Sequence, residues 1–351
     1  MSKPLVTVCI PTYNGAAHLS ECLESVCLQT YREVEILVVD DCSTDQTAHI
    51  ISEYQKRDRR LRFVRNARNL GLTGNWERCA QLAKGDYIKF AFQDDVLYPQ
   101  CIDVLMRSMQ RGVRFAFCAR EFVADDGTDK ALLNGLERGR RRITELFAGR
   151  RLLSPELFCQ SVLDSMQMNI VGEPTVTLMH RDVLTRYGHF NPDFVQIIDF
   201  EYWCRVGANE SISYVPEVLA KFRLHAGSET SRNLTRRVYQ AEVVDRLLLL
   251  HEFAFAPIFG GLREVAQTRR PPLDLVDLFY DQAYWAAGIA RERCDGPRGP
   301  QSAAFGVLEA AAARYPALLG RVPLKYALAR KWRAVRKLVR GLEPSRTVEH
   351  Q

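Results

Sequence analysis

"DYIKFAFQDDVLYP", residues 86–99, is the stretch from which the expected fold follows. Its apolar run from Tyr87 to Phe92 predicts a buried β-strand. That run leads directly into two adjacent acids, Asp94 and Asp95, which repel each other and lose hydration if the strand ends in a cleft. Mg²⁺ or Mn²⁺ would offset this repulsion, because hard divalent cations prefer carboxylate oxygens. A solvated Asp-Asp turn is the alternative, and this fragment alone does not choose between them.

The composition is that of an ordinary globular protein, with 351 residues, 47% of them hydrophobic and 26% charged. This length suits one large domain and a smaller one, which we place at residues 1–230 and 231–351. The formal net charge of +6 comes from the second part, which has 20 Lys and Arg against 12 Asp and Glu. The first part has 28 against 30, so the basic character lies away from the acid pair.

The chain shows no sign of export or of a metal-binding cysteine motif. Pro11 and Asn14 interrupt the short apolar stretch at the N-terminus, which therefore predicts a strand and not a signal peptide. The most apolar later stretch is interrupted by His251, Glu252 and Pro257 and is too broken to span a bilayer. We expect a cytoplasmic protein. The 10 cysteines include no C-x-x-C pair, which indicates reduced thiols and argues against zinc.

Predicted strands alternate with predicted helices along the first hundred residues. We expect strands at 4–10, 34–40, 61–66 and 86–92, with a helix after each of the first three. This alternation indicates a parallel sheet covered by helices, and such sheets bind ligands at the carboxyl ends of their strands.

Polar residues follow every one of these strands, so they converge on one edge of the sheet. The groups are Pro11 to Gly15, Asp40 with Asp41, Asn69 to Gly71, and Gln93 to Asp95. No G-x-G-x-x-G or P-loop motif follows the first strand, which argues against a dinucleotide-binding fold. A sugar nucleotidyltransferase would need a Gly- and Lys-rich triphosphate loop there, and that loop is also missing.

These blocks resemble the family 2 glycosyltransferases of GT-A fold, of the bacterial surface-polysaccharide type. The likeness covers about the first hundred residues and resumes at "VGEPTVTLMHRDVL", "IIDFEYWCRV" and "KFRLHAGS". It does not cover the last third of the chain. The resemblance implies an α/β fold with a mixed, mainly parallel sheet flanked by helices, which we expect to be followed by a helical C-terminal region. It also implies an enzyme that moves a sugar from a nucleoside-diphosphate donor.

The resemblance further implies roles for residues at the donor site. Asp40 would accept the N3–H of a pyrimidine, and a lone carboxylate suits the single N–H between two carbonyls. This favours UDP- or dTDP-sugars, with GDP-sugars as the plausible exception. Asp94 would lie near the ribose and metal, Asp95 would hold Mn²⁺ or Mg²⁺ on the diphosphate, and His225 is a further candidate ligand. The donor-binding set that we expect comprises Pro11, Thr12, Tyr13, Asp40, Asn69, Gly71, Asn75, Gln93 and Asp94.

Asp199 matches the catalytic base of the family. An acceptor hydroxyl must lose its proton during attack, which calls for a carboxylate and predicts direct displacement with inversion. The alternative for Asp199 is a helix N-cap, and Glu201 is the reserve base. On the acceptor side we expect Glu173, Glu201 and Trp203, although Glu173 also suits a simple turn.

Three further features have open interpretations. Trp76 suits packing under the sheet better than stacking on a ligand, and residues 125–130 suggest a solvated hairpin tip. Residues 324–340 combine an apolar stripe with seven basic residues and no acid, which favours binding to an anionic membrane over packing on the protein.

We therefore expect a glycan or lipid-linked acceptor, a location that includes the inner membrane face, and no nucleic-acid partner. A noncatalytic nucleotide-sugar-binding scaffold is the alternative function, with a nucleotidyltransferase less favoured.

Overall fold

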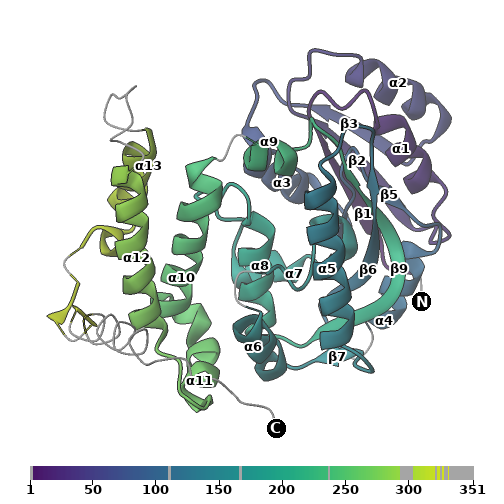
Figure 1. The fold of residues 1–351 in the computed structure, drawn as a ribbon. Helices are drawn as coiled ribbons and strands as arrows, with labels where there is room; N and C mark the ends of the chain where they lie inside the picture. Colours follow the sequence, from purple (N-terminus) through teal and green to yellow (C-terminus); the bar gives the residue numbers. More distant parts are fainter. Residues whose placement is uncertain are drawn as a thin grey trace, which may run out of the picture.

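The computed structural model describes residues 3–109, 112–165, 168–235, 238–292, 303–320, 322–324, 326–327 and 331. Its centre is a mixed sheet, which has nine strands within these ranges. The strands lie in the order β3-β2-β1-β4-β8-β6-β9-β5, and β7 pairs with β9 (Figure 1). This confirms the expected mixed, mainly parallel α/β fold.

The first half of the sheet is the parallel part that the sequence predicts. Strand β1 pairs in parallel with β2 and β4, and β2 pairs in parallel with β3. Every residue of β1 is buried, as expected for a strand covered on both faces. The strand at 86–92 ends two residues early, because Asp95 N–H already turns back to the carbonyl of Phe92. The elements are β1 (Val6–Thr12), α1 (Leu19–Cys27), β2 (Val34–Asp40), α2 (Thr47–Arg57), β3 (Leu61–Arg65), α3 (Gly71–Leu82) and β4 (Tyr87–Phe90).

The second half of the sheet reverses direction. Strand β8 is antiparallel to both β4 and β6, while β9 runs parallel to β6 through an irregularity at Ala119. This half brings the acceptor-side segments to the same edge as the ends of β1 and β2. Its elements are β5 (Val96–Leu97), α4 (Cys101–Ser108), β6 (Phe115–Ala124), α5 (Lys130–Leu146), β7 (Leu152–Leu153), α6 (Pro155–Asp164), a 3₁₀ turn (Pro174–Val176), β8 (Thr177–His180), α7 (Asp182–Tyr187), α8 (Ile198–Gly207) and β9 (Ile212–Leu224).

The C-terminal part is helical, as expected. Helices α10, α12 and α13 stand on the left of Figure 1, and α8 and α6 lie between them and the sheet. One apolar core runs from the sheet through α8 into α10 and α12. The elements are α9 (Glu229–Thr235), a π-helical turn (Gln240–Val244), α10 (Asp245–Phe255), a 3₁₀ turn (Pro257–Phe259), α11 (Gly260–Thr268), α12 (Leu275–Glu292), α13 (Ala303–Arg314) and a last 3₁₀ turn (Pro316–Leu318).

The basic segment at 324–340 lies almost entirely outside the described residues. Of its apolar stripe only Leu324 is described, and that side chain is 73% exposed. Among the residues that the structure describes, no helix is both long and apolar enough to cross a membrane.

Candidate active site

The loop after β1 is clamped by Gln93, which follows β4. The Gln93 Oε1 atom accepts hydrogen bonds from Thr12 Oγ1 (2.6 Å) and from Tyr13 N (2.8 Å). Its amide nitrogen donates to the carbonyl of Tyr13 at 3.3 Å. Pro11 and Thr12 are buried, whereas the Tyr13 ring is 45% exposed at the end of the strand. Of the residues expected around the nucleotide base, Tyr13 is therefore the one with a free face, and Gln93 holds it in place.

Asp40 ends β2 and is fully buried. Its carboxylate accepts hydrogen bonds from the backbone N–H and the hydroxyl of Ser43, and Arg65 Nε lies 3.5 Å away. The position at the carboxyl end of a parallel strand agrees with a site for the base. The carboxylate is not open to solvent in this structure, and its present donors come from Ser43.

The neighbouring Asp41 has a role that the sequence reading missed. Its buried carboxylate accepts the backbone N–H groups of Leu70 (2.8 Å) and Gly71 (2.9 Å), and the Asn66 amide at 2.8 Å. It thereby fixes the loop that precedes α3. Asn69 supports the same loop by donating to the Asp41 carbonyl. Asn69 and Gly71, which we expected to bind the sugar donor, thus lie at the sheet edge. They are held there by Asp41, the residue after Asp40.

Asn75 is placed differently from the expectation that it contacts the donor. It is 4% exposed, lies within α3, and donates to the Val39 carbonyl at 3.1 Å. Its amide oxygen accepts from Asn66 at 3.0 Å. Because these polar atoms are used inside the protein, Asn75 braces the strand ends. Trp76 packs in the core with its ring 4.9 Å from that of Phe92.

The two adjacent acids differ sharply in their surroundings. Asp95 is fully buried; its carboxylate accepts the Thr175 hydroxyl and, at 3.0 Å, the backbone N–H of Arg223. Burial, and then the charge of Asp94, raises the pKa of Asp95 well above its usual range. Asp94 is only half-buried, and its Oδ2 lies 3.1 Å from His225 Nε2. This corrects our expectation for Asp95: it is a structural link between strands, and Asp94 is the acid that faces the site.

Arg223 donates four hydrogen bonds or ion pairs to groups around Asp94 and Asp95. In the sequence it was noted only as part of "KFRLHAGS". Besides its N–H to Asp95, its Nε donates to the Asp94 carbonyl at 3.1 Å. Its guanidinium also pairs with Asp125 (3.0 Å) and Glu21 (2.5 Å). Asp125 therefore belongs to the site edge, and residue 125 is not the solvated hairpin tip that we expected.

His18 lies at the same corner. Its Nε2 is 3.1 Å from Asp125 Oδ2, and its ring centroid is 4.9 Å from that of His225. Two histidines and the half-buried Arg223 thus lie around Asp94. Their N–H groups are donors suited to an anionic ligand, while Asp125 and Glu21 pair with the charge of the arginine.

Asp199 lies in the first turn of α8. Its Oδ2 accepts from Asn169 Nδ2 at 3.1 Å, and its Oδ1 accepts the N–H of Phe200 at 2.7 Å. Burial, followed by the nearby charge of Glu173, raises the pKa of Asp199 to about 7, while Arg120 acts in the opposite direction. The sequence held no clear signal for Asn169, since one loop asparagine usually indicates a turn. The result is a carboxylate poised near neutral pH.

Glu173 forms a half-buried ion pair with Arg120, which is itself 6% exposed on β6. The preceding Gly172 has φ +112°, and a Cβ there would lie 2.6 Å from the Arg120 guanidinium. Glycine is therefore required both by its backbone conformation and by the close approach of Arg120. This turn holds the Arg120–Glu173 pair beside Asp199.

Two expected acceptor-side residues prove to be internal. Glu201 is 1% exposed and pairs with Arg205 at 2.8 Å. Trp203 is fully buried and donates through Nε1 to the Gly172 carbonyl at 2.9 Å. Their place on α8 explains this, since both side chains project into the protein interior while Asp199 meets the Asn169 loop. Glu201 is therefore a poor reserve base, and Trp203 supports the Gly172 turn.

The donor atoms near Asp94 fit a divalent cation that is shared with a diphosphate. Within the described ranges, no group of three or more His, Cys, Asp or Glu side chains is placed to hold a metal by itself. Asp94 and His225 supply two donor atoms 3.1 Å apart. Two ligands at right angles about Mg²⁺ lie roughly 3 Å apart, and Mg²⁺ commonly takes one or two protein ligands with substrate phosphates and water.

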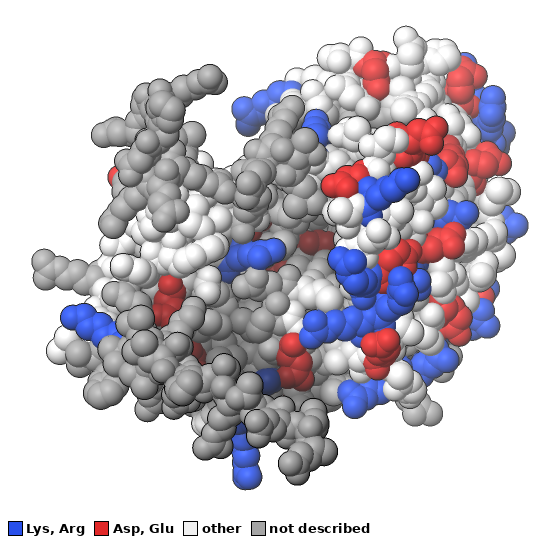
Figure 2. Space-filling view, viewed as in Figure 1, with Lys and Arg blue, Asp and Glu red and all other residues white. Residues whose placement is uncertain are grey.

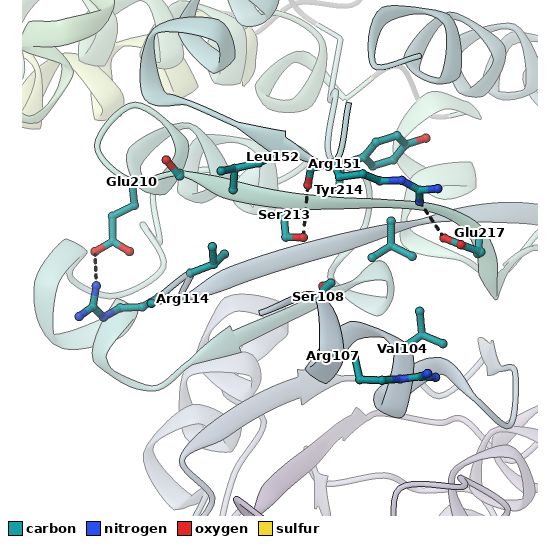
Figure 3. A pocket seen from close by; sticks show the side chains of 14 residues that line it. Val104, Arg107, Ser108, Arg114, Arg151, Leu152, Glu210, Ser213, Tyr214 and Glu217 are labelled. Carbon is teal, nitrogen blue, oxygen red and sulfur yellow. Dashed lines mark hydrogen bonds and ion pairs between the residues drawn. The ribbon is translucent and has the colours of Figure 1, made fainter. Parts of the chain in front are cut away.

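Other surface features lie outside this site. An open cavity of about 880 Å³ lies where β6 and β9 begin, at the end opposite the carboxylates (Figure 3). Its charged side chains are paired, with Arg114–Glu210 at 3.6 Å and Arg151–Glu217 at 3.2 Å. Figure 2 shows basic side chains over the lower part of α5, and the exposed arginines of this stretch are Arg138, Arg141, Arg142 and Arg150.

Comparison with known proteins gives consistent matches. The family model described as glycosyl transferase family 2 matches residues 7–163. An uncharacterized protein of Mycobacterium tuberculosis is 33% identical over 250 residues, which are 71% of this chain and 75% of that protein. The mannosyltransferase PcManGT from Pyrobaculum calidifontis, in complex with GDP-Man and Mn²⁺, has a TM-score of 0.53 at 16% identity, covering 95% of this chain and 84% of that one. TarS 1–349 of S. aureus, in complex with UDP, has a TM-score of 0.51 at 17% identity, covering 81% and 87%.

Substitution of Asp95 should lower the stability of the protein more than substitution of Asp94. We expect Asp95→Ala to lower the free energy of unfolding by about 1–3 kcal/mol, because it leaves the buried Arg223 N–H and Thr175 hydroxyl without their acceptor. Asp94→Ala removes a half-buried side chain and should change that free energy by less than about 0.5 kcal/mol. Urea denaturation of both variants checks this. Equal losses, or a greater loss for Asp94→Ala, would show that Asp95 is not the structural member of the pair.

Proposed function

Because this chain belongs to family 2 of the glycosyltransferases, we propose that it transfers a sugar from a UDP- or dTDP-sugar to a hydroxyl of a glycan or lipid-linked acceptor, with inversion at the anomeric carbon. The family makes it an enzyme that uses a nucleotide-sugar donor. The observation that supports the finer proposal is Asp199, a buried carboxylate in the first turn of α8 whose pKa is raised to about 7.

Asp199 suits the role of general base. Asn169 and the N–H of Phe200 fix the orientation of its carboxylate. A base works best when its pKa is close to the working pH, because it is then both deprotonated and able to accept a proton. Asp199 would take the proton of the acceptor hydroxyl as that oxygen attacks the anomeric carbon. A single displacement from this side inverts the configuration, which is why we propose inversion.

The opposite side suits a nucleoside diphosphate. Tyr13 offers an exposed ring for the base, and Asp40 ends the adjacent strand as the proposed acceptor of a pyrimidine N3–H. Binding of UDP by TarS agrees with this preference, while PcManGT was solved with GDP-Man. The uridine or thymidine preference therefore rests on the chemistry of Asp40.

We propose that Asp94 and His225 hold Mn²⁺ or Mg²⁺ once the diphosphate is bound. The cation supplies Lewis-acid stabilisation of the negative charge that grows on the leaving group. Arg223 acts independently of it, because its guanidinium fixes the backbone at Asp94 and brings positive charge to the same corner. The Mn²⁺ bound to PcManGT supports this assignment by analogy of fold alone.

The proposed acceptor side contains Glu173 beside Asp199. We also propose that residues 324–340 bind an anionic membrane surface, which would place the enzyme next to a lipid-linked acceptor. The support for this is the sequence pattern of that segment and the exposed Leu324 side chain.

The rate of UDP release should follow the ionisation of Asp199. A base acts in its deprotonated form, so we expect kcat to rise with pH below about 7 and to level off above it. Asp199→Asn should lower kcat by roughly 10²–10⁴ while UDP still binds with nearly its original Kd. Glu173→Gln removes the negative charge that raises the pKa of Asp199, so the rise should move to lower pH. Normal turnover by Asp199→Asn would mean that another group is the base.

Metal and nucleotide should bind together. Calorimetry should show weak binding of Mn²⁺ to the protein alone, because Asp94 and His225 provide only two ligands, and much tighter binding when UDP is present. Asp94→Asn should remove the dependence of UDP affinity on Mn²⁺ and leave the affinity in EDTA unchanged. Asp103→Asn, at a partly exposed position on α4 where the side chain pairs with Arg107, is the matched control and should behave as wild type. UDP binding that is equally tight in EDTA and in Mn²⁺ would refute the metal assignment.

A further inference from the structure

The loop at residues 191–197, which leads into α8, is held by the C-terminal helices. Asn191 donates to the Tyr315 hydroxyl at 3.2 Å, and Arg314 at the end of α13 pairs with Asp193 at 2.7 Å. Gln240 donates to the Asp193 carbonyl at 3.1 Å. Contacts from two separate segments of the C-terminal region therefore converge on one short loop.

The central contact is made by Asp245, the first residue of α10, which is fully buried. Its carboxylate accepts three consecutive backbone N–H groups, from Val195 (3.0 Å), Gln196 (2.6 Å) and Ile197 (3.2 Å). Gln240 Nε2 donates to its other oxygen at 3.2 Å. Burial raises the pKa of Asp245 to about 6, and the backbone hydrogen bonds act against that rise. Such a set of donors matches a carboxylate closely in both charge and direction.

These three amides lie at the point where α8 begins. Ile197 directly precedes the helix, and its carbonyl accepts the N–H of Glu201 at 3.0 Å. Asp199 is only two residues further on. The Gln196 side chain, in turn, accepts from Asn233 of α9 at 2.9 Å, and α9 follows the loop that carries His225. The loop thus connects the base helix to the donor side of the site.

We propose that Asp245 is a positioning residue, which sets the start of α8 and so holds Asp199 in place relative to the donor. This inference rests on the proposed function of Asp199. A shift of about 1 Å in a catalytic group can cost 10²-fold in rate even when the change is made far from the chemistry. Through Asp245 the start of α10 then supports the site, although it lies outside it.

The test is Asp245→Asn, which keeps the shape of the side chain but removes its charge and puts an NH2 group in place of one acceptor oxygen, where it meets the Gln240 amide donor. We expect the amides of residues 195–197 to exchange with deuterium at least about tenfold faster, because their acceptor is weakened. We expect kcat for UDP release to fall roughly 10- to 100-fold, with the Kd for UDP within about twofold of wild type. Tyr239→Phe is the matched control, since it removes a different buried hydrogen bond of the same region, to the Ala286 carbonyl at 2.8 Å. It should change neither exchange at 195–197 nor kcat.

Gln240→Leu is a milder second variant that removes one donor to Asp245 and should shift both readouts in the same direction, by less. It decides the matter if Asp245→Asn does not fold. The proposal is overturned if exchange at 195–197 is unchanged, or if it accelerates while kcat stays at the wild-type value. It is also overturned if Tyr239→Phe lowers kcat equally. Absence of UDP release by the wild type would instead refute the proposed function, and the exchange measurement would still show whether Asp245 anchors the loop.

Discussion

The two halves of the sheet are joined at the site by the buried carboxylate of Asp95. It follows β4, the last of the parallel strands, and accepts one hydrogen bond from Thr175 before β8 and another from the backbone of β9 at Arg223. A buried carboxylate is costly unless its oxygens are satisfied, so this point fixes three chain segments at once. The positions of Asp94, His225 and the Gly172 turn all follow from it.

Buried acids with backbone donors recur through the site. Asp41 holds the loop before α3, and Asp245 holds the loop before α8. In each case the carboxylate fixes a connection that regular secondary structure would leave free, because it satisfies N–H groups that lie outside any helix or strand ladder. Asp94 differs in that it is half-buried and its carboxylate meets a side chain, His225. Asp199 is buried like the others, and the chemical role that we propose for it is what sets it apart.

The first four strands, the helices between them and the edge at which their polar ends meet could be predicted from the sequence, because local periodicity and turn residues determine them. The mixed order of the second half could not, since β8 and β9 pair with strands far away in sequence. The same limit explains the errors at the site. Asp94 and Asp95 are adjacent and chemically identical in the sequence, and only their distant partners His225, Thr175 and Arg223 separate their roles. Asp245 was not singled out from the sequence, because its backbone partners at 195–197 lie about fifty residues away.

The segments that hold α8 in place are synthesised in a fixed order, and this order determines when each contact can form. β9 pairs with β5, β6 and β7, so the sheet cannot close until residue 224 has emerged. The N–H groups of residues 195–197 gain their acceptor only after Asp245 has been synthesised. The contacts of the neighbouring Asn191 and Asp193 form later still, because they require Tyr315 and Arg314. Such distant pairings form slowly, because a long chain segment must close before they stabilise it. The edge around Asp94 and His225 can therefore form once residue 225 has emerged, whereas the loop before α8 gains its last contacts only after Tyr315.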